Sequence, residues 1–250
     1  MSLASLAGAR IPHGRPGGGD PDFANVGYLL HFDDILTPNA FPDVIGNTWA
    51  RNGATAANSF VSGDNPMFGP GSLRVRMTGS DANSCSIVST VTPYVMSPTN
   101  TFTIEGFVYW NGSVDAQTMI GAVNTSVAVR EIRLYVQANA DVLRLDAIFN
   151  GTLHTLTASP ASNAYQFAAG TFDGTTLRLF AGPPGGTAVL LASSTVSPGA
   201  SKTVTGYEIG FFTGANHSTP SFVDEARFTF NKCRYTTDFL VPTEAFPDFL

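Results

Sequence analysis

The chain has 250 residues, and charged side chains make up only 13% of them, about half of the usual share. Its net charge is −6 and its pI is near 5.0, which argues against nucleic acid or an anionic membrane as the main partner, because binding phosphates needs clustered Lys and Arg. Nineteen phenylalanines supply enough apolar surface for one large domain.

Residues 1–25 differ in composition from the rest of the chain. The stretch "ARIPHGRPGGGDP" holds three prolines and four glycines and has no hydrophobic period. Such a segment keeps one conformation only where another surface fixes it, because ordering each residue costs about 1–2 kcal/mol of backbone entropy. We therefore predict an extended N-terminal arm that anchors the protein to neighbouring subunits, with a flexible leader segment as the alternative. The residues expected to contact those partners are Leu3, Leu6, Arg10, Ile11, Pro12 and Arg15.

From residue 26 onward the pattern predicts β-strands. Apolar and polar residues alternate in most of the segments, as in "TFTIEGFVYW", where Phe102, Ile104, Gly106, Val108 and Trp110 share one face. No helical period of useful length occurs. The expected strands lie in residues 27–34, 71–77, 101–110, 130–136, 141–149, 152–158, 165–172, 175–182, 187–193, 206–212 and 222–230.

Turn residues indicate how the strands pair. Asn150-Gly151 favours a type I′ hairpin turn, and Asp173-Gly174 is expected to act in the same way. About a dozen strands joined by hairpins predict an all-β fold with two stacked antiparallel sheets. We expect one β-sandwich over residues 26–250. Its C-terminal tail, residues 231–250, ends in apolar residues spaced by prolines and is predicted to pack along the body.

The order of these segments resembles a known family. "LLHFDD", "FGPGSLRV", "FTIEGFVYW", "GTFDGTTLRLFAG" and "FVDEARFT" are followed by "CRYTTDFLVPTEAFP". This order is similar to the concanavalin A-like lectin/glucanase superfamily, in particular to the laminin-G-type (LamG) jelly-roll domains found in bacteriophage structural proteins. The resemblance covers residues 27 to about 247, and "RYTTDFLVPTEAF" is its most specific part. It implies a sandwich of two curved sheets that often serves glycan binding or protein contact, and it implies no activity by itself.

The sequence does not favour catalysis. Glucanases of this fold need two carboxylates that face one sugar. Asp224 and Glu225 are adjacent, so their side chains are expected to point to opposite faces of a strand. Asp224 would share the core face with Phe222, Ala226 and Phe228 and is interpreted as a structural acid, with a metal ligand or a catalyst as the alternatives. Glu105 has no matching acid two residues away. We predict no enzymatic activity and no catalytic residue.

No metal or cofactor site is predicted. Calcium needs about six to eight oxygens at one point, and the acids at 33, 34, 43 and 64 are interpreted as solvated loop carboxylates. The four histidines have no zinc-like spacing. Cys85 and Cys233 are interpreted as small buried residues, although a bridge between them stays open. We see no signal peptide and no stretch of about 20 apolar residues that would cross a membrane, so we expect synthesis in a cytoplasm.

Glycan contacts are a further hypothesis, because sugars stack on exposed aromatic rings and are oriented by Asn, Asp and His. The candidate residues are Trp49, which lies near Asn47 and Asn52, and the pair Asn216 and His217. The alternative for each is ordinary packing in the core or at the rim of the sandwich.

Taken together, the arm, the low charge and the family resemblance predict a non-enzymatic bacteriophage virion protein. The leading placement is a capsid decoration protein, displayed on the particle surface and anchored by its arm to other virion proteins in multiple copies. The alternatives are a tail or baseplate adhesin and a free carbohydrate-binding module that recognises host surface glycans.

Overall fold

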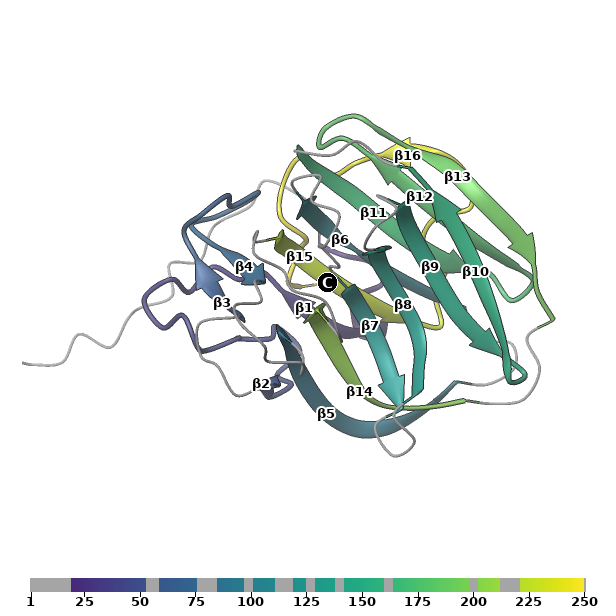
Figure 1. Ribbon diagram of the computed structural model, residues 1–250, viewed down its shortest axis with the longest axis horizontal. Helices are drawn as coiled ribbons and strands as arrows, with labels where there is room; N and C mark the ends of the chain where they lie inside the picture. The colour runs from purple at the N-terminus through teal and green to yellow at the C-terminus, as the bar shows by residue number, and fades with distance from the viewer. Residues whose placement is uncertain are drawn as a thin grey trace, which may run out of the picture.

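The computed structural model is all-β and forms a jelly-roll sandwich of two antiparallel sheets (Figure 1). It describes residues 19–52, 59–75, 85–96, 101–110, 119–124, 129–137, 142–159, 164–197, 202–211 and 221–249. Within these ranges the only helical element is a short 3-10 turn, Phe23–Asn25. None of the described helical segments has the length and hydrophobicity to span a membrane. The predicted fold class is confirmed.

The larger sheet has nine strands, in the order β16-β13-β12-β11-β6-β15-β4-β3, and β1 also pairs with β15. The bounds are β1 Val26–Leu30, β3 Ser59–Ser62, β4 Ser72–Val75, β6 Phe102–Trp110, β11 Ala164–Phe172, β12 Thr176–Gly182, β13 Thr187–Thr195, β15 Ser221–Phe230 and β16 Phe239–Leu240.

The smaller sheet has seven strands, in the order β10-β9-β8-β7-β14-β5-β2. Its bounds are β2 Trp49–Asn52, β5 Cys85–Met96, β7 Met119–Asn124, β8 Val129–Gln137, β9 Val142–Phe149, β10 Thr152–Ala158 and β14 Lys202–Phe211.

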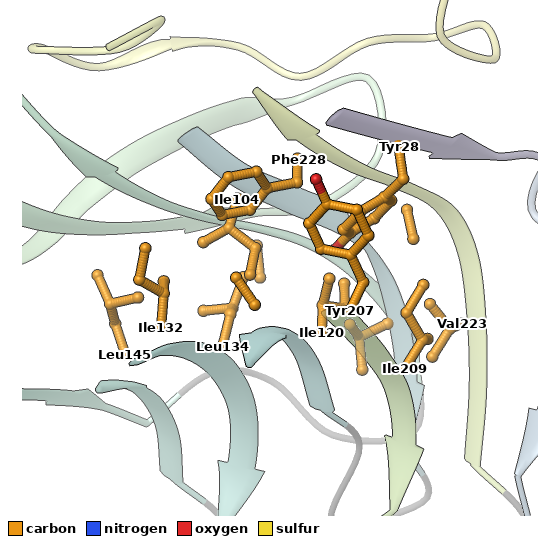
Figure 2. Close-up of a cluster of buried hydrophobic side chains, with 14 of the residues drawn as sticks. Tyr28, Ile104, Ile120, Ile132, Leu134, Leu145, Tyr207, Ile209, Val223 and Phe228 are labelled. Atoms are coloured by element: carbon orange, nitrogen blue, oxygen red, sulfur yellow. The ribbon is translucent and has the colours of Figure 1, made fainter. Parts of the chain in front are cut away.

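The main core lies between the two sheets (Figure 2). Phe102, Ile104 and Val108 of β6 point into it, as the alternation predicts, and Leu134 and Leu145 of the smaller sheet meet them from the other side. Each large side chain buried in this way stabilises the fold by about 1.5–3 kcal/mol. Because successive side chains of a strand point to opposite faces, the residues on either side of Leu134 in β8 and of Leu145 in β9 face away from the core.

A second apolar cluster covers the outer face of the nine-stranded sheet. Phe107, Phe167 and Phe180 project from that face, and Val241 and Phe246 of the C-terminal segment pack over them. In the middle of this sheet both faces are consequently buried, which is why every residue of β15 is buried.

The two predicted hairpins form with different turns. Asn150 and Gly151 have φ values of 50° and 73°, as a type I′ turn requires. The second hairpin joins Phe172 to Thr176, and only Gly174 has a positive φ there. The predicted type I′ turn is therefore wrong at this site, where the Asp173 carboxylate accepts hydrogen bonds from the next residues of a longer loop.

Candidate functional site

The outer face of the seven-stranded sheet carries a group of polar side chains on neighbouring strands. Arg133 of β8 lies opposite Asp146 of β9, and Asp146 lies opposite Thr155 of β10. In the adjacent row Tyr135 lies opposite Arg144. The strand alternation that sends their neighbours into the core turns these side chains outward. We call the set Arg133, Tyr135, Gln137, Arg144, Asp146 and Thr155 the polar face.

Asp146 is the centre of the polar face. Its Oδ2 accepts hydrogen bonds from Nε of Arg133 at 2.9 Å and from the Tyr135 hydroxyl at 3.0 Å. Its Oδ1 accepts from the Thr155 hydroxyl at 2.7 Å and from Nη2 of Arg144 at 3.3 Å. Burial alone would raise the pKa of Asp146, but the Thr155 hydrogen bond and the two guanidinium charges lower it. The carboxylate is therefore ionised and fixes the groups around it.

The two arginines shape the accessible part of the polar face. Their guanidinium carbons lie 4.9 Å (Arg133) and 5.5 Å (Arg144) from the centre of the Tyr135 ring, and Nη1 of Arg144 donates to Oε1 of Gln137 at 2.7 Å. Their side chains stay 31% and 21% exposed, whereas Asp146 is 1% exposed. Burial and the charge of Asp146 raise the pKa of Tyr135 to about 12, so its hydroxyl stays protonated and donates.

The same sheet face continues toward β14 and β5. Glu208 of β14 and Gly121 of β7 complete the row that contains Arg133 and Asp146. Ser86 of β5 donates to Oε1 of Glu208 at 2.7 Å. Glu208 and Ser86 are buried, so the accessible part of the face is formed by Arg133, Gln137, Arg144 and Thr155, which present guanidinium groups, an amide and a hydroxyl.

Sequence reasoning missed the polar face and selected Trp49 instead. The Trp49 ring is buried, lies edge-on to Tyr28 at 5.5 Å and stacks with Tyr207 at 6.2 Å. Its Nε1 donates to Oδ2 of Asp43 at 2.9 Å. This placement favours the packing role that the sequence left open for Trp49.

The remaining candidates for glycan and partner binding lie outside the described residues. These are Asn216, His217 and the arm residues Leu3, Leu6, Arg10, Ile11, Pro12 and Arg15. Residues 19–25, which the sequence assigns to the arm, lie against the sandwich. There Oδ1 of Asp22 forms an ion pair with Nζ of Lys232 at 3.0 Å.

The loop acids do not form a metal site. In the part of the chain that the structure describes, no group of three or more His, Cys, Asp or Glu side chains is placed to hold a metal ion. Asp43 is buried and accepts a hydrogen bond from the Leu29 N–H as well as from Trp49. The interpretation of Asp43 as a solvated carboxylate is therefore wrong. Burial raises the pKa of Asp43, and its hydrogen bonds, that from Trp49 above all, only partly oppose this.

Asp224 and Glu225 do not follow the alternation that the sequence predicts. The register of β15 against β6 shifts between Asp224 and Arg227, and Glu225 adopts a φ of 53°. Ala226 faces the core between the sheets. The prediction that Asp224 shares the core side with Ala226 is wrong, because the extra residues of a bulge reverse the alternation.

Both of these carboxylates lie on the outer side of the nine-stranded sheet. Oδ2 of Asp224 accepts the backbone N–H groups of residues 67–68 at 2.8 and 3.0 Å. Oε2 of Glu225 accepts the Phe246 N–H, and its Oε1 lies 2.7 Å from Nδ1 of His31. Burial and the neighbouring Glu225 charge raise the pKa of Asp224 well above its usual value. The predicted opposite orientation is thus also wrong, and both acids hold loops and the C-terminal segment on the sheet.

A second arginine–carboxylate cluster lies under the C-terminal segment. Oε1 of Glu105 accepts Nε of Arg227 at 2.8 Å, and Oε2 accepts the Tyr235 hydroxyl at 2.7 Å. Asp20 accepts Nη1 of Arg227 at 2.9 Å and Nη2 of Arg234 at 2.8 Å. We call Asp20, Glu105, Arg227, Arg234 and Tyr235 the buried network. It joins Asp20, near the start of the described chain, and the segment that follows β15 to β6 and β15.

Cys233 is a free cysteine, so the bridge to Cys85 that the sequence left open is absent. Its Sγ contacts the Tyr235 carbonyl oxygen at 3.3 Å. Burial raises the pKa of the thiol, which keeps it protonated.

Comparisons with known proteins identify the fold. No protein-family model matches the sequence, and no curated protein matches it either. The receptor binding domain of botulinum neurotoxin mosaic serotype C/D, with a tetraethylene glycol molecule on its Hcn sub-domain, aligns with a TM-score of 0.56 at 11% identity over 83% of this chain and 48% of that one. The binding domain of Botulinum Neurotoxin DC in complex with SialylT aligns with a TM-score of 0.55 at 13% identity, over 83% and 48% of the two chains.

A GH131 β-glucanase catalytic domain from Podospora anserina aligns with a TM-score of 0.48 at 12% identity, over 88% of this chain and 98% of that one. A likeness at that TM-score carries no argument about function. This chain spans about half the length of the toxin binding domains that it matches. At these identities the likeness shows the fold alone, which is a jelly-roll β-sandwich.

Proposed function

We propose that this protein is a non-catalytic glycan-binding module that holds its ligand on the polar face. The observation that carries the proposal is the arrangement of Arg133 and Arg144, both held by the buried Asp146 while their side chains stay partly exposed. Donors fixed before binding lose little freedom when a ligand arrives, which favours affinity.

The chemistry of the polar face suits sugar hydroxyls, which both donate and accept hydrogen bonds. Arg133 and Arg144 supply donors, Gln137 and the exposed Thr155 supply groups of both kinds, and the planar guanidinium groups offer a surface against which a sugar ring can lie. A neighbour in fold was solved as a complex with SialylT, which supports the use of this kind of sandwich in glycan recognition.

Two features support the absence of catalysis. Glycoside hydrolysis needs two carboxyl groups that flank one bond, about 5–5.5 or 6.5–9.5 Å apart and open to the sugar. Asp224 and Glu225 are fully buried and accept hydrogen bonds from the backbone. Asp146 is occupied by four surrounding side chains. These acids are therefore assigned to structure.

A virion role remains the second candidate, and the sequence alone supports it. Its support is the order of strand segments that resembles LamG-type domains of bacteriophage structural proteins, together with the Gly/Pro-rich residues 1–25 as an anchoring arm. In that setting the protein is a capsid decoration protein, or a tail or baseplate adhesin, that contacts other virion proteins. The two candidates are compatible, because a displayed sandwich can also bind host glycans. Detection of the protein in purified particles tests this role.

A glycan array with the full chain tests the binding proposal. The wild-type protein is expected to bind one class of glycan reproducibly. Arg133→Ala and Arg144→Ala are each expected to weaken that binding roughly 10–100-fold, because a hydrogen bond to a charged group contributes about 1.5–3 kcal/mol.

Arg178→Ala is the matched control for these variants. Arg178 is also partly exposed and pairs with an acid, Asp173 at 2.7 Å, but it belongs to β12 of the other sheet. It should bind glycan like the wild type, and circular dichroism should show that all three variants fold. A wild-type protein that binds no glycan, or an equal loss in the Arg178 variant, contradicts the proposal.

A further inference from the structure

Strand β10 forms an open edge of the seven-stranded sheet. It pairs with β9 at all seven residues from Thr152 to Ala158 without a register shift, and no other described strand pairs with it. Its sequence, TLHTLTA, contains no Asp, Glu, Lys, Arg, Pro or Gly. Sheet edges that stay free are usually protected by charges, prolines or bulges. This edge has none of those features.

Apolar side chains are exposed beside this edge. β13 lies next to β10 where the two sheets meet (Figure 1), and β16 pairs with β13 only at Thr187 and Ala188. Of the nine large hydrophobic residues that are exposed in the described part of the chain, five lie on these three strands, with exposed fractions from 38% to 79%. They are Leu153, Val189, Leu190, Leu191 and Leu240. Such a concentration marks an interaction surface.

We propose that a second copy of this chain pairs with the β10 edge and joins two seven-stranded sheets into one. Two copies related by a two-fold axis bring the same strand against itself, and this pairing is antiparallel. β10 suits it because an edge without carboxylates or ammonium groups meets its own copy without repulsion between like charges. The exposed Leu153, on β10 itself, then becomes covered by the second copy.

The strand length defines the register of this pairing. Full overlap of the seven residues places Thr155 opposite Thr155 of the second copy, and Leu153 opposite Thr157 of the second copy. Residues 153, 155 and 157 all project from the outer side of the sheet, because Leu156 belongs to the core and alternate residues point away from it.

The dimer would turn both polar faces in the same direction. The two-fold axis of an antiparallel strand pair runs perpendicular to the sheet, so the outer faces of both copies form one surface. The β9 strands, which carry Arg144 and Asp146, would lie three inter-strand spacings apart, or about 14–15 Å. Two binding sites at that spacing would increase the avidity for any repeating ligand. The pairing itself does not depend on what the polar face binds.

The experiment compares oligomeric state by sedimentation equilibrium of the full chain over a range of concentrations. The wild type is expected to dimerise. The double variant Leu153→Lys/Thr157→Lys places like charges opposite each other in the predicted register, and we expect its dimer dissociation constant to rise at least tenfold. The variant Leu153→Lys/Thr157→Glu places opposite charges there and is expected to restore the dimer.

Leu36→Lys is the control, because Leu36 is a loop residue that is 90% exposed, and this variant should dimerise like the wild type. Thermal melts establish that every variant is folded. A wild type that stays monomeric overturns the proposal and leaves the edge to a foreign strand. A dimer that survives the double lysine variant also overturns it. A dimer lost only when residues 2–18 are deleted assigns the contact to that segment and overturns the β10 pairing.

Discussion

The two outer faces of the sandwich carry the same chemistry in different surroundings. Each has two arginines held by a buried carboxylate beside a tyrosine. In the buried network the side chains of Arg227 and Arg234 are 5% and 10% exposed. On the polar face Arg133 and Arg144 are 31% and 21% exposed. The difference comes from the C-terminal segment, which covers the nine-stranded sheet, and it separates a structural cluster from one that can still bind.

The covering segment makes the energetics of the two clusters unequal. A buried charge that loses its partner cannot turn to water, so breaking such a pair is costly, whereas a partly exposed pair contributes little. We therefore expect mutations to affect folding on the covered side and ligand binding on the open side.

The largest expected effect comes from a mutation in the C-terminal segment that covers the nine-stranded sheet. Phe246 is buried, packs with Phe107 at a ring distance of 6.3 Å and lies 3.9 Å beneath the Arg227 guanidinium. We expect Phe246→Ala to lower the free energy of unfolding by about 4 kcal/mol, because it leaves a cavity and exposes the buried network. Urea denaturation measures this. Phe249→Ala, at a position that is 46% exposed, should cost less than about 1 kcal/mol. Similar losses of unfolding free energy in the two variants would contradict the stabilising role of the C-terminal segment.

The next effect compares the two central carboxylates. Glu105→Ala leaves Arg227 buried beside only one partner acid, and we expect it to lower the free energy of unfolding by about 3 kcal/mol. Asp146→Ala leaves arginines that can reach water, and we expect a loss of about 1 kcal/mol. Glycan binding should respond in the reverse order, with a strong loss only in the Asp146 variant. Equal destabilisation by the two variants would remove the distinction between the faces.

The smallest effect is a pH dependence on the covered side. Burial would raise the pKa of Asp20, but hydrogen bonds from Arg234 and from the Asp22 N–H, together with the charge of Arg227, lower it below the ordinary 3.8. A group with a lowered folded-state pKa stabilises the fold above its unfolded pKa, and this contribution disappears as the pH falls through the folded value. The unfolding free energy should therefore fall below about pH 4, and Asp20→Asn should show a shallower slope.

Asp224 contributes with the opposite sign to the same profile. Its folded-state pKa is raised, so its stabilising contribution is present at low pH and is lost as the pH rises. Because the wild type and the Asp20→Asn variant share Asp224, the difference between their slopes isolates Asp20. Parallel slopes would show that the Asp20 hydrogen bonds do not lower its pKa in the folded protein.

The sequence predicts the fold class because the alternation of apolar residues survives in most strands. "TFTIEGFVYW" places its core face correctly, and Asn150-Gly151 forms the expected turn. The alternation fails at Asp224, because a non-glycine residue, Glu225, adopts a positive φ and no local signal announces the bulge. Trp49 is misleading for another reason: the carboxylate of Asp43, six residues earlier in the chain, accepts the hydrogen bond that lets the ring be buried, and the sequence does not show that the loop folds back to bring them together.

The sequence predicts the orientation of the polar-face side chains but not the contacts between them. The alternation in "REIRLYV" and "DVLRLDAIF" already turns Arg133, Tyr135, Arg144 and Asp146 away from the core. The pattern does not give the register of one strand against the next, and this register brings the four residues into contact. The buried network was harder still, because it joins Asp20 to Arg227 and Arg234 across most of the chain.

The contact between the Asp20 N–H and the Phe249 carbonyl oxygen, 2.8 Å long, has a practical consequence for orientation. Both residues lie on the covered side of the sandwich, opposite the polar face. A tether attached at Phe249 would leave the molecule on the covered side and hold the two arginines of the polar face toward the surrounding solution. Immobilisation through Phe249, which is 46% exposed, should therefore leave ligand access intact, whereas coupling beside Arg133 would place the polar face against the support.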